Sequence, residues 1–227
     1  MENRRFLECC CTDAAEALEA QAGGARRVEL CEDLSCGGVT PGRENIEETL
    51  RSVNIPVNVL IRARGGDFVY DEDEVEEMVR SVRMCRELGV NGVVIGALGK
   101  DGSVDTGTAG RLIAEAKGLH LTFHRAFDEC SDPFKALEDI IALGCDRLLT
   151  AGHATNVNDG KEMLKRLNAK ADGRIIILAG SGVRPGNIAD IEAYAGIKEF
   201  HSSSHGAAGR TSRETVAAMV TPVHCPE

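Results

Sequence analysis

The sequence predicts a (β/α)8 barrel, a closed ring of eight parallel strands in which a helix follows each strand. Short apolar, β-branched runs recur eight times along the 227 residues, and each precedes a polar or glycine-containing loop and a segment of helical periodicity. No linker or change of composition divides the chain. We therefore expect a single α/β domain over residues 1–227, with an open doubly wound sheet as the alternative.

The expected strands begin 21 to 35 residues apart, which leaves room for a strand, a loop, a crossover helix and a return loop. They are residues 6–10, 27–31, 57–61, 92–95, 121–123, 147–149, 175–179 and 199–201. Capping residues mark several helices between them. The expected starts are Asp13 with Glu16, Asp71 with Glu74, and Asp132 before Pro133, and the expected ends are Gly89 and Gly144.

The last unit is the weakest part of this prediction. The best helix candidate after the eighth strand is short, roughly residues 212–220. We expect the eighth helix to be stunted or missing. A missing helix would open the apolar outer side of the first and eighth strands to water, so we expect a homo-oligomer contact or the folded-back tail to cover it.

Composition excludes several classes of protein. Acidic residues outnumber basic ones by 36 to 26, giving a net charge of −10, and no Lys/Arg run is interleaved with aromatics, so we expect no nucleic-acid partner. We expect no membrane association and a cytoplasmic location, because no apolar stretch is long enough for a span or a secretory signal. The nine cysteines are expected to be thiols. Walker, zincin, esterase and Cys-x-x-Cys motifs are absent, and no organic cofactor is expected.

Strand alternation predicts which side chains face the barrel interior. Apolar residues such as Leu7 and Val28 should face the helices, which leaves their neighbours pointing inward near the carboxyl ends of the strands, where barrel sites are built. The inward polar set is Glu8, Cys10, Glu29, Cys31, Asn58, Arg62, Arg64, Thr122, His124, Glu199, His201 and Ser203. Buried charges that merely pair with one another, and cysteines that act as small hydrophobes, are the alternative interpretation.

These residues also permit enzyme chemistry. Arg62 and Arg64, two residues apart, could clamp a small anion. The candidate acid/base residues are Glu8, Glu29, His124 and His201. A second set of anion-binding candidates follows the seventh and eighth strands, where barrel enzymes often hold phosphate: Gly180, Gly182, Ser202 and Ser203.

Several strings closely resemble the copper homeostasis protein CutC family, in order and at family-like spacing from residue 6 to about 204. They are Glu-x-Cys at 8–10, Val-Glu-Leu-Cys at 28–31, Gly-Gly-Val-Thr-Pro at 37–41, Arg-x-Arg-Gly-Gly-Asp-Phe at 62–68, Thr-Phe-His-Arg-Ala-Phe-Asp at 122–128 and Glu-Phe-His-Ser-Ser at 199–203. The resemblance implies a cytoplasmic barrel that self-associates, a role in copper tolerance, and Cu(I) ligation at Cys10 and Cys31. It implies no established reaction.

The chain departs from the family pattern at three places. Ala63 stands where the family commonly has proline, residues 179–182 are less rich in glycine, and the family has a longer C-terminal segment.

Two hypotheses follow. The first is a CutC-type protein with the copper ion as its partner: Cys10 and Cys31 lie on adjacent strands about 4.8 Å apart, and soft thiolates favour Cu(I). The direction of the thiol pKa shift stays open, because nearby arginines lower it and acids raise it. The alternative is an enzyme that acts on a small carboxylated or phosphorylated metabolite.

Overall fold

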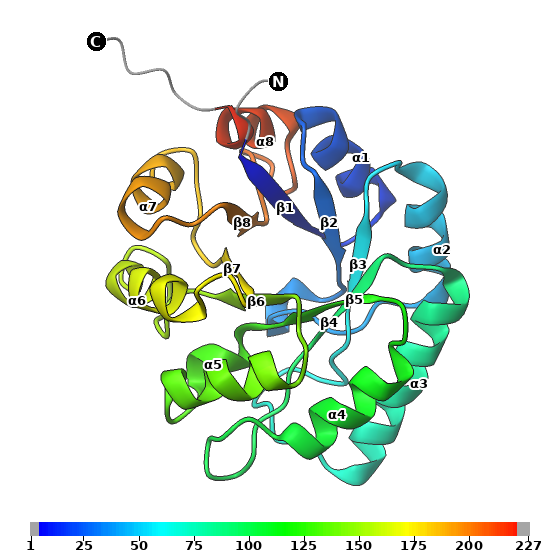
Figure 1. Cartoon of the computed structure of the whole chain (residues 1–227). Coiled ribbons are helices and arrows are strands. Elements are labelled where there is room, and N and C mark those ends of the chain that lie inside the picture. The colour runs from blue at the N-terminus through cyan, green and yellow to red at the C-terminus, as the bar shows by residue number, and fades with distance from the viewer. Residues whose placement is uncertain (1–4, 222–227) are drawn as a thin grey trace.

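The computed structural model describes residues 5–221, and its eight strands close into a parallel barrel in chain order (Figure 1). The strands are β1 (Phe6–Cys11), β2 (Arg27–Leu30), β3 (Val57–Leu60), β4 (Gly92–Ile95), β5 (His120–Phe123), β6 (Arg147–Thr150), β7 (Ile176–Ala179) and β8 (Glu199–Ser202). Each agrees with its expected run to within one residue at either end. The predicted fold class is confirmed, and the open sheet is excluded.

The helices surround the ring of strands (Figure 1). They are α1 (Ala14–Gly23), α2 (Arg43–Ser52), α3 (Glu72–Leu88), α4 (Thr106–Glu115), α5 (Pro133–Ala142), α6 (Lys161–Ala171), α7 (Ile188–Ala195) and α8 (Arg213–Val220), with 3-10 turns η1 (Leu34–Cys36) and η2 (Arg125–Glu129). The predicted caps are present. Asp71 and Glu74 form a full capping box, and the Asp132 side chain accepts hydrogen bonds at the start of α5.

The eighth helix is present, although it has only eight residues. It packs against α1 and β1 and buries Val216, Met219 and Val220. The contact with α1 is tight: a Cβ on Gly23 would lie 2.5 Å from the Cβ of Val216, so only glycine fits there. The expected stunted eighth helix is therefore present, and the alternative of a missing helix is excluded; its two turns cover the outer side of β1.

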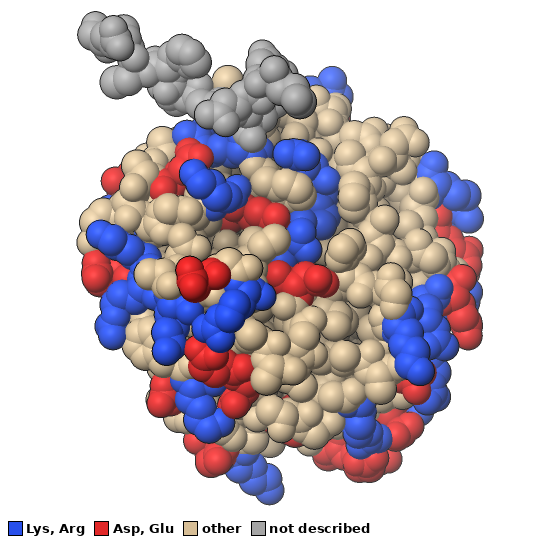
Figure 2. Space-filling model, in the orientation of Figure 1, with Lys and Arg blue, Asp and Glu red and all other residues tan. Residues whose placement is uncertain are grey.

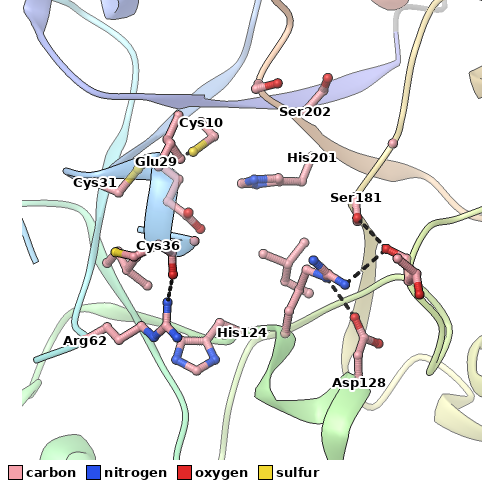
Figure 3. A pocket seen from close by; sticks show the side chains of 18 of the residues that line it. Cys10, Glu29, Cys31, Cys36, Arg62, His124, Asp128, Ser181, His201 and Ser202 are labelled. Carbon is pink, nitrogen blue, oxygen red and sulfur yellow. Dashed lines mark hydrogen bonds and ion pairs between the residues drawn. The ribbon is translucent and has the colours of Figure 1, made fainter. Parts of the chain in front are cut away.

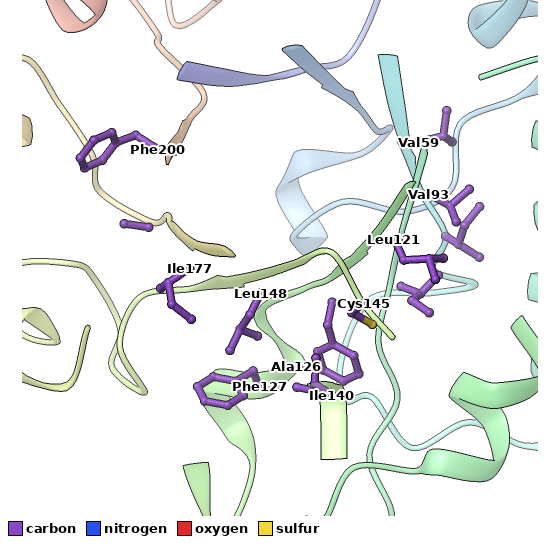
Figure 4. Packing of buried hydrophobic residues seen from close by; sticks show 14 of the residues in the cluster. Val59, Val93, Leu121, Ala126, Phe127, Ile140, Cys145, Leu148, Ile177 and Phe200 are labelled. Atoms are coloured by element: carbon purple, nitrogen blue, oxygen red, sulfur yellow. The ribbon is translucent and has the colours of Figure 1, made fainter. Parts of the chain in front are cut away.

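Apolar side chains form two separate layers. The larger layer lies between the strands and the helices and includes Leu7 and Phe200, as Figure 4 shows for part of it. The smaller layer lies inside the barrel and consists of Cys10, Cys31, Leu60 and Val94. Leu7 and Cys10 thus face opposite sides of β1, as strand alternation predicts.

Strand register places the polar interior residues side by side. Glu8 of β1 lies opposite His201 of β8 on one side and Arg27 of β2 on the other. Two residues further along β1, Cys10 lies opposite Glu29. Closure of the barrel is what brings β8 beside β1, so His201 and Glu8 meet although 193 positions separate them.

Acidic and basic side chains are interleaved around the rim of the face shown in Figure 2. Many form ion pairs between neighbouring helices, such as Arg213 of α8 with Glu19 of α1. Within residues 5–221, no helix combines the length and the apolar character that crossing a membrane requires.

Candidate functional site

A cavity of about 740 Å³ opens at the carboxyl ends of the strands (Figure 3). This size suits a small organic molecule and far exceeds that of a single ion. Most of the inward residues predicted from the sequence line it: Cys10, Glu29, Cys31, Arg62, His124, His201, Gly182, Ser202 and Ser203. The cavity is thus on the face where barrel sites are usually built.

Two buried thiols form part of the cavity wall. The Sγ atoms of Cys10 and Cys31 lie 3.4 Å apart, close enough for one thiol to donate a hydrogen bond to the other. This hydrogen bond, together with burial and the nearby Glu29 carboxylate, raises the pKa of Cys10 well above its ordinary value. The direction that the sequence left open is therefore upward, and the Cys10 thiol is protonated in the metal-free protein.

The Glu29 carboxyl is buried in the same wall. Its Oε2 atom has no hydrogen-bond partner among the described residues. Burial is the main cause of a raised pKa, about 7, while His201 and Arg27 oppose the shift and Glu8 adds to it. Glu29 is therefore the acidic group of the cavity whose charge state changes near neutral pH.

The Glu8 carboxylate fixes the orientation of the His201 ring. Its Nδ1 lies 2.8 Å from Oε1 of Glu8, which leaves Nε2 for the cavity. Burial alone would lower the pKa of His201, but Glu29 and Glu8 outweigh it and raise the pKa. Burial would likewise raise the pKa of Glu8, but Arg27 and His201 lower it to about 2. Glu8 is fully buried and does not line the cavity, so it positions His201 and is not itself an accessible acid or base.

The charged pairs continue to the other end of the barrel. Arg27 bonds Glu8 through Nε and Glu199 through Nη2, the latter at 3.0 Å. Glu199 also accepts from Arg147 at 2.8 Å. Each buried charge in this row of arginines and carboxylates therefore has a partner of opposite sign, as burial of charge demands.

His124 is neutral, with one ring nitrogen accepting a hydrogen bond and the other carrying the proton. Its Nδ1 accepts from the amide of Ala126 at 3.1 Å, so the ring proton is on Nε2, which has no partner among the described residues. Burial, with help from Arg62, lowers the pKa of His124 to about 3. A ring with this pKa stays neutral near pH 7, and its Nε2–H is then a donor for a ligand in the cavity. Gly96 leaves the space that the ring needs, since a Cβ there would lie 2.4 Å from Cε1.

Arg62 holds two glycine loops over the cavity. Its guanidinium donates to the carbonyls of Cys36, Gly38 and Gly66 at 3.1, 3.0 and 2.6 Å. It also lies 4.7 Å above the Phe68 ring, which packs against His124. Its Nε remains without a partner within the described part of the chain.

The expected pair of arginines does not form, because Arg64 does not line the cavity. Its guanidinium contacts Glu74 at 2.5 Å and Asp67 at 3.1 Å. β3 ends at Leu60, so strand alternation no longer controls residue 64, and the carboxylate of α3 attracts its side chain instead. Gly180 does not line the cavity either; it makes room for Leu149, which a Cβ would approach to 2.5 Å.

At the end of the cavity that carries serine hydroxyls, the Ser202 hydroxyl already forms hydrogen bonds with neighbouring loop residues. Ser202 Oγ donates to the carbonyl of Val183 at 2.9 Å and accepts from Arg184 and from the Ser204 amide. Gly182 adopts a positive φ of 78°, which glycine tolerates. Ser203 also lines the cavity.

The family comparison agrees with the strings found in the sequence. The model of the CutC family matches residues 5–206, which include every strand and all the cavity residues described above. The chain belongs to the CutC family.

CutC relatives of known sequence match most of the chain. A CutC family protein of Parabacteroides distasonis is 50% identical over 202 residues, 88% of this chain and 83% of the relative. One from Chromobacterium violaceum is 46% identical over 202 residues, 89% of this chain and 82% of the relative.

Solved structures agree on the fold. A structure described as a candidate copper homeostasis protein CutC from Streptococcus agalactiae superposes with a TM-score of 0.83 at 32% identity, covering 88% of this chain and 98% of that one. An aldolase, QR15, superposes with a TM-score of 0.69 at 17% identity, covering 94% of this chain and 96% of that one, which shows the barrel fold alone.

Sequence reasoning missed several residues of this CutC site. Arg27 lies two positions before Glu29 on β2, so strand alternation places both side chains on the same side of the strand. This pattern could have identified Arg27 from the sequence. Cys36 of η1 and Arg125 of η2 also line the cavity, and Arg125 is paired with Asp128 at 2.8 Å. Those two lie in loops, where no periodicity indicates the direction of a side chain.

Proposed function

We propose that this CutC protein binds Cu(I) through the thiolates of Cys10 and Cys31 and acts in copper homeostasis. The observation that carries the proposal is the 3.4 Å separation of the two Sγ atoms at the cavity wall. Soft thiolates are the donors that select Cu(I). The name of the Streptococcus agalactiae structure supports the same role. Self-association and a cytoplasmic location, which the family resemblance implies, belong to the proposal.

Protons compete with copper at this site. Because the pKa of Cys10 is raised well above its ordinary value, binding of Cu(I) must release a proton from that thiol. Affinity for Cu(I) should therefore increase with pH over the physiological range.

Competition with a colorimetric Cu(I) chelator under reducing, anaerobic conditions tests the proposal. We expect Cys10→Ser and Cys31→Ser each to weaken Cu(I) binding by roughly 100-fold or more, because a hydroxyl is a hard donor. Cys9→Ser is the matched control. The Cys9 side chain is buried on the helix side of β1, with its Sγ 3.3 Å from Oγ of Ser204, and its replacement should change the affinity little. Equal losses in all three variants would exclude this thiol pair as the specific site.

The cavity itself favours a second candidate function, the binding of a small anion. Its volume exceeds what an ion needs, and both Arg62 Nε and His124 Nε2 are buried donors without partners among the described residues. A carboxylated or phosphorylated metabolite could accept from both.

Calorimetric titration with inorganic phosphate tests anion binding. We expect Arg62→Lys to weaken binding by roughly 10-fold and Arg62→Ala by more, because a hydrogen bond to a charged group is worth about 1.5–3 kcal/mol. Arg64→Ala is the matched control and should bind phosphate as the wild type does, since Arg64 does not line the cavity. Absence of heat with wild-type protein at millimolar phosphate would count against this candidate.

A further inference from the structure

We propose that Cys10, Glu29 and His201 form a site for a divalent metal ion of borderline softness, of the Zn²⁺ class. This site shares Cys10 with the proposed Cu(I) pair but does not use Cys31, so it goes beyond the proposed function and does not depend on it. Figure 3 shows the Glu29 and His201 side chains pointing toward one another beside Cys10.

The three donor atoms are already close together. A sulfur of Cys10, a carboxylate oxygen of Glu29 and a ring nitrogen of His201 all lie within 4.8 Å of one another. Ligands around a tetrahedral zinc ion lie roughly 3.5 Å apart, given bonds of about 2.0–2.3 Å. Small side-chain rotations therefore suffice to close the site, and the backbone, fixed by the barrel, need not move.

Glu29 provides a separate indication of a ligand. Glu29 lines the cavity and is only 5% exposed. Its Oε2 atom has no hydrogen-bond partner among the described residues. A buried carboxylate oxygen without a partner carries a free-energy cost that a cation would remove. Cu(I) held by two thiolates would leave this atom unpaired.

A carboxylate holds the His201 ring in place, as is usual for metal-binding histidines. The Glu8 carboxylate, 2.8 Å from Nδ1, fixes the ring and directs Nε2 into the cavity. Metal-ligating histidines typically donate their other ring N–H to such a carboxylate. Glu8 is in turn bonded by Arg27, so the orientation of the ring is fixed by a fully buried pair.

The donor set suits a divalent ion better than a monovalent soft one. A thiolate, a carboxylate and an imidazole supply two negative charges, which neutralise a 2+ ion in this buried setting. Imidazole and carboxylate are common zinc ligands, and three protein ligands leave a fourth position open to the cavity, as in catalytic zinc sites. An anion in the cavity could occupy that position.

Spectroscopic titration of the full-length, metal-free protein with Co²⁺ tests the inference, because Co²⁺ reports tetrahedral geometry and sulfur ligation by its absorption. We expect wild-type protein to show both signatures and Zn²⁺ to displace the Co²⁺. Glu29→Gln and His201→Gln should weaken Co²⁺ binding by more than the roughly 10–100-fold that is lost when a group that hydrogen-bonds to a metal ligand is removed. Cys31→Ser should retain it. Cys36→Ser, which removes a thiol elsewhere in the cavity lining, is the matched control.

The same variants separate this inference from the Cu(I) proposal. Cys31→Ser should lose Cu(I) and keep Co²⁺, whereas Glu29→Gln should lose Co²⁺ and keep Cu(I). Loss of Co²⁺ in Cys31→Ser with normal binding in Glu29→Gln would overturn the mixed-donor site and leave the thiol pair standing. Failure of wild-type protein to bind Co²⁺ at millimolar concentration would also overturn it. If circular dichroism shows that His201→Gln does not fold, the Co²⁺ affinity of Glu29→Gln alone decides whether the mixed-donor site exists.

Discussion

Replacing Arg27 with methionine should lower the free energy of unfolding by roughly 3–5 kcal/mol, the range expected when one partner of a buried ion pair is removed. Arg27 is only 4% exposed and bonds both Glu8 and Glu199. Glu199 would still have Arg147, but Glu8, which is fully buried, would lose its arginine partner. The pKa of Glu8, about 2, reflects how strongly Arg27 and His201 stabilise its charge.

Urea denaturation followed by far-ultraviolet circular dichroism measures this loss. Arg213→Ala is the matched control, because Arg213 also pairs with a glutamate, Glu19, but at the surface, where its side chain is 56% exposed. An exposed pair is worth about 1 kcal/mol or less. A loss in Arg27→Met no larger than in Arg213→Ala would show that the row of buried charges does not stabilise the barrel.

Glu29→Gln should stabilise the metal-free protein at pH 8 and leave it unchanged at pH 4. The folded protein favours the protonated carboxyl, since burial raises the pKa of Glu29 from 4.5 to about 7. Its contribution to stability is therefore complete below pH 4.5 and is lost as the pH rises through 7. Each pKa unit corresponds to about 1.4 kcal/mol, so the wild type loses on the order of 3 kcal/mol that glutamine retains.

Unfolding free energies of wild type and Glu29→Gln, measured between pH 4 and 8 with a chelator present, give the comparison. The two should coincide at pH 4 and diverge as the pH rises toward 8. Glu48→Gln, an exposed substitution on α2, should follow the wild type throughout. If the unfolding free energies of wild type and Glu29→Gln changed with pH in the same way, the pKa of Glu29 would not be raised in the folded protein.

Local patterns were enough to predict much of this protein. The eight strands and the capped starts of α3 and α5 follow from contacts within a few residues of the chain, so the sequence reveals them directly. Alternation along a strand is equally local, which is why Cys10 and Cys31 were correctly assigned to the inside of the barrel. The prediction failed at Arg64, which lies four residues beyond the end of β3, where a carboxylate on α3 determines the direction of its side chain.

The sequence by itself determined the order of strands and helices, the inward phase of the strand residues and the family strings. Only the tertiary structure decided that eight residues of α8 cover β1, that Glu8 meets both His201 and Arg27, and that the pKa of Cys10 rises. The reason is physical. Alternation and capping depend on neighbours in the chain, whereas ion pairing and desolvation depend on which distant strands barrel closure brings together and how completely water is excluded between them.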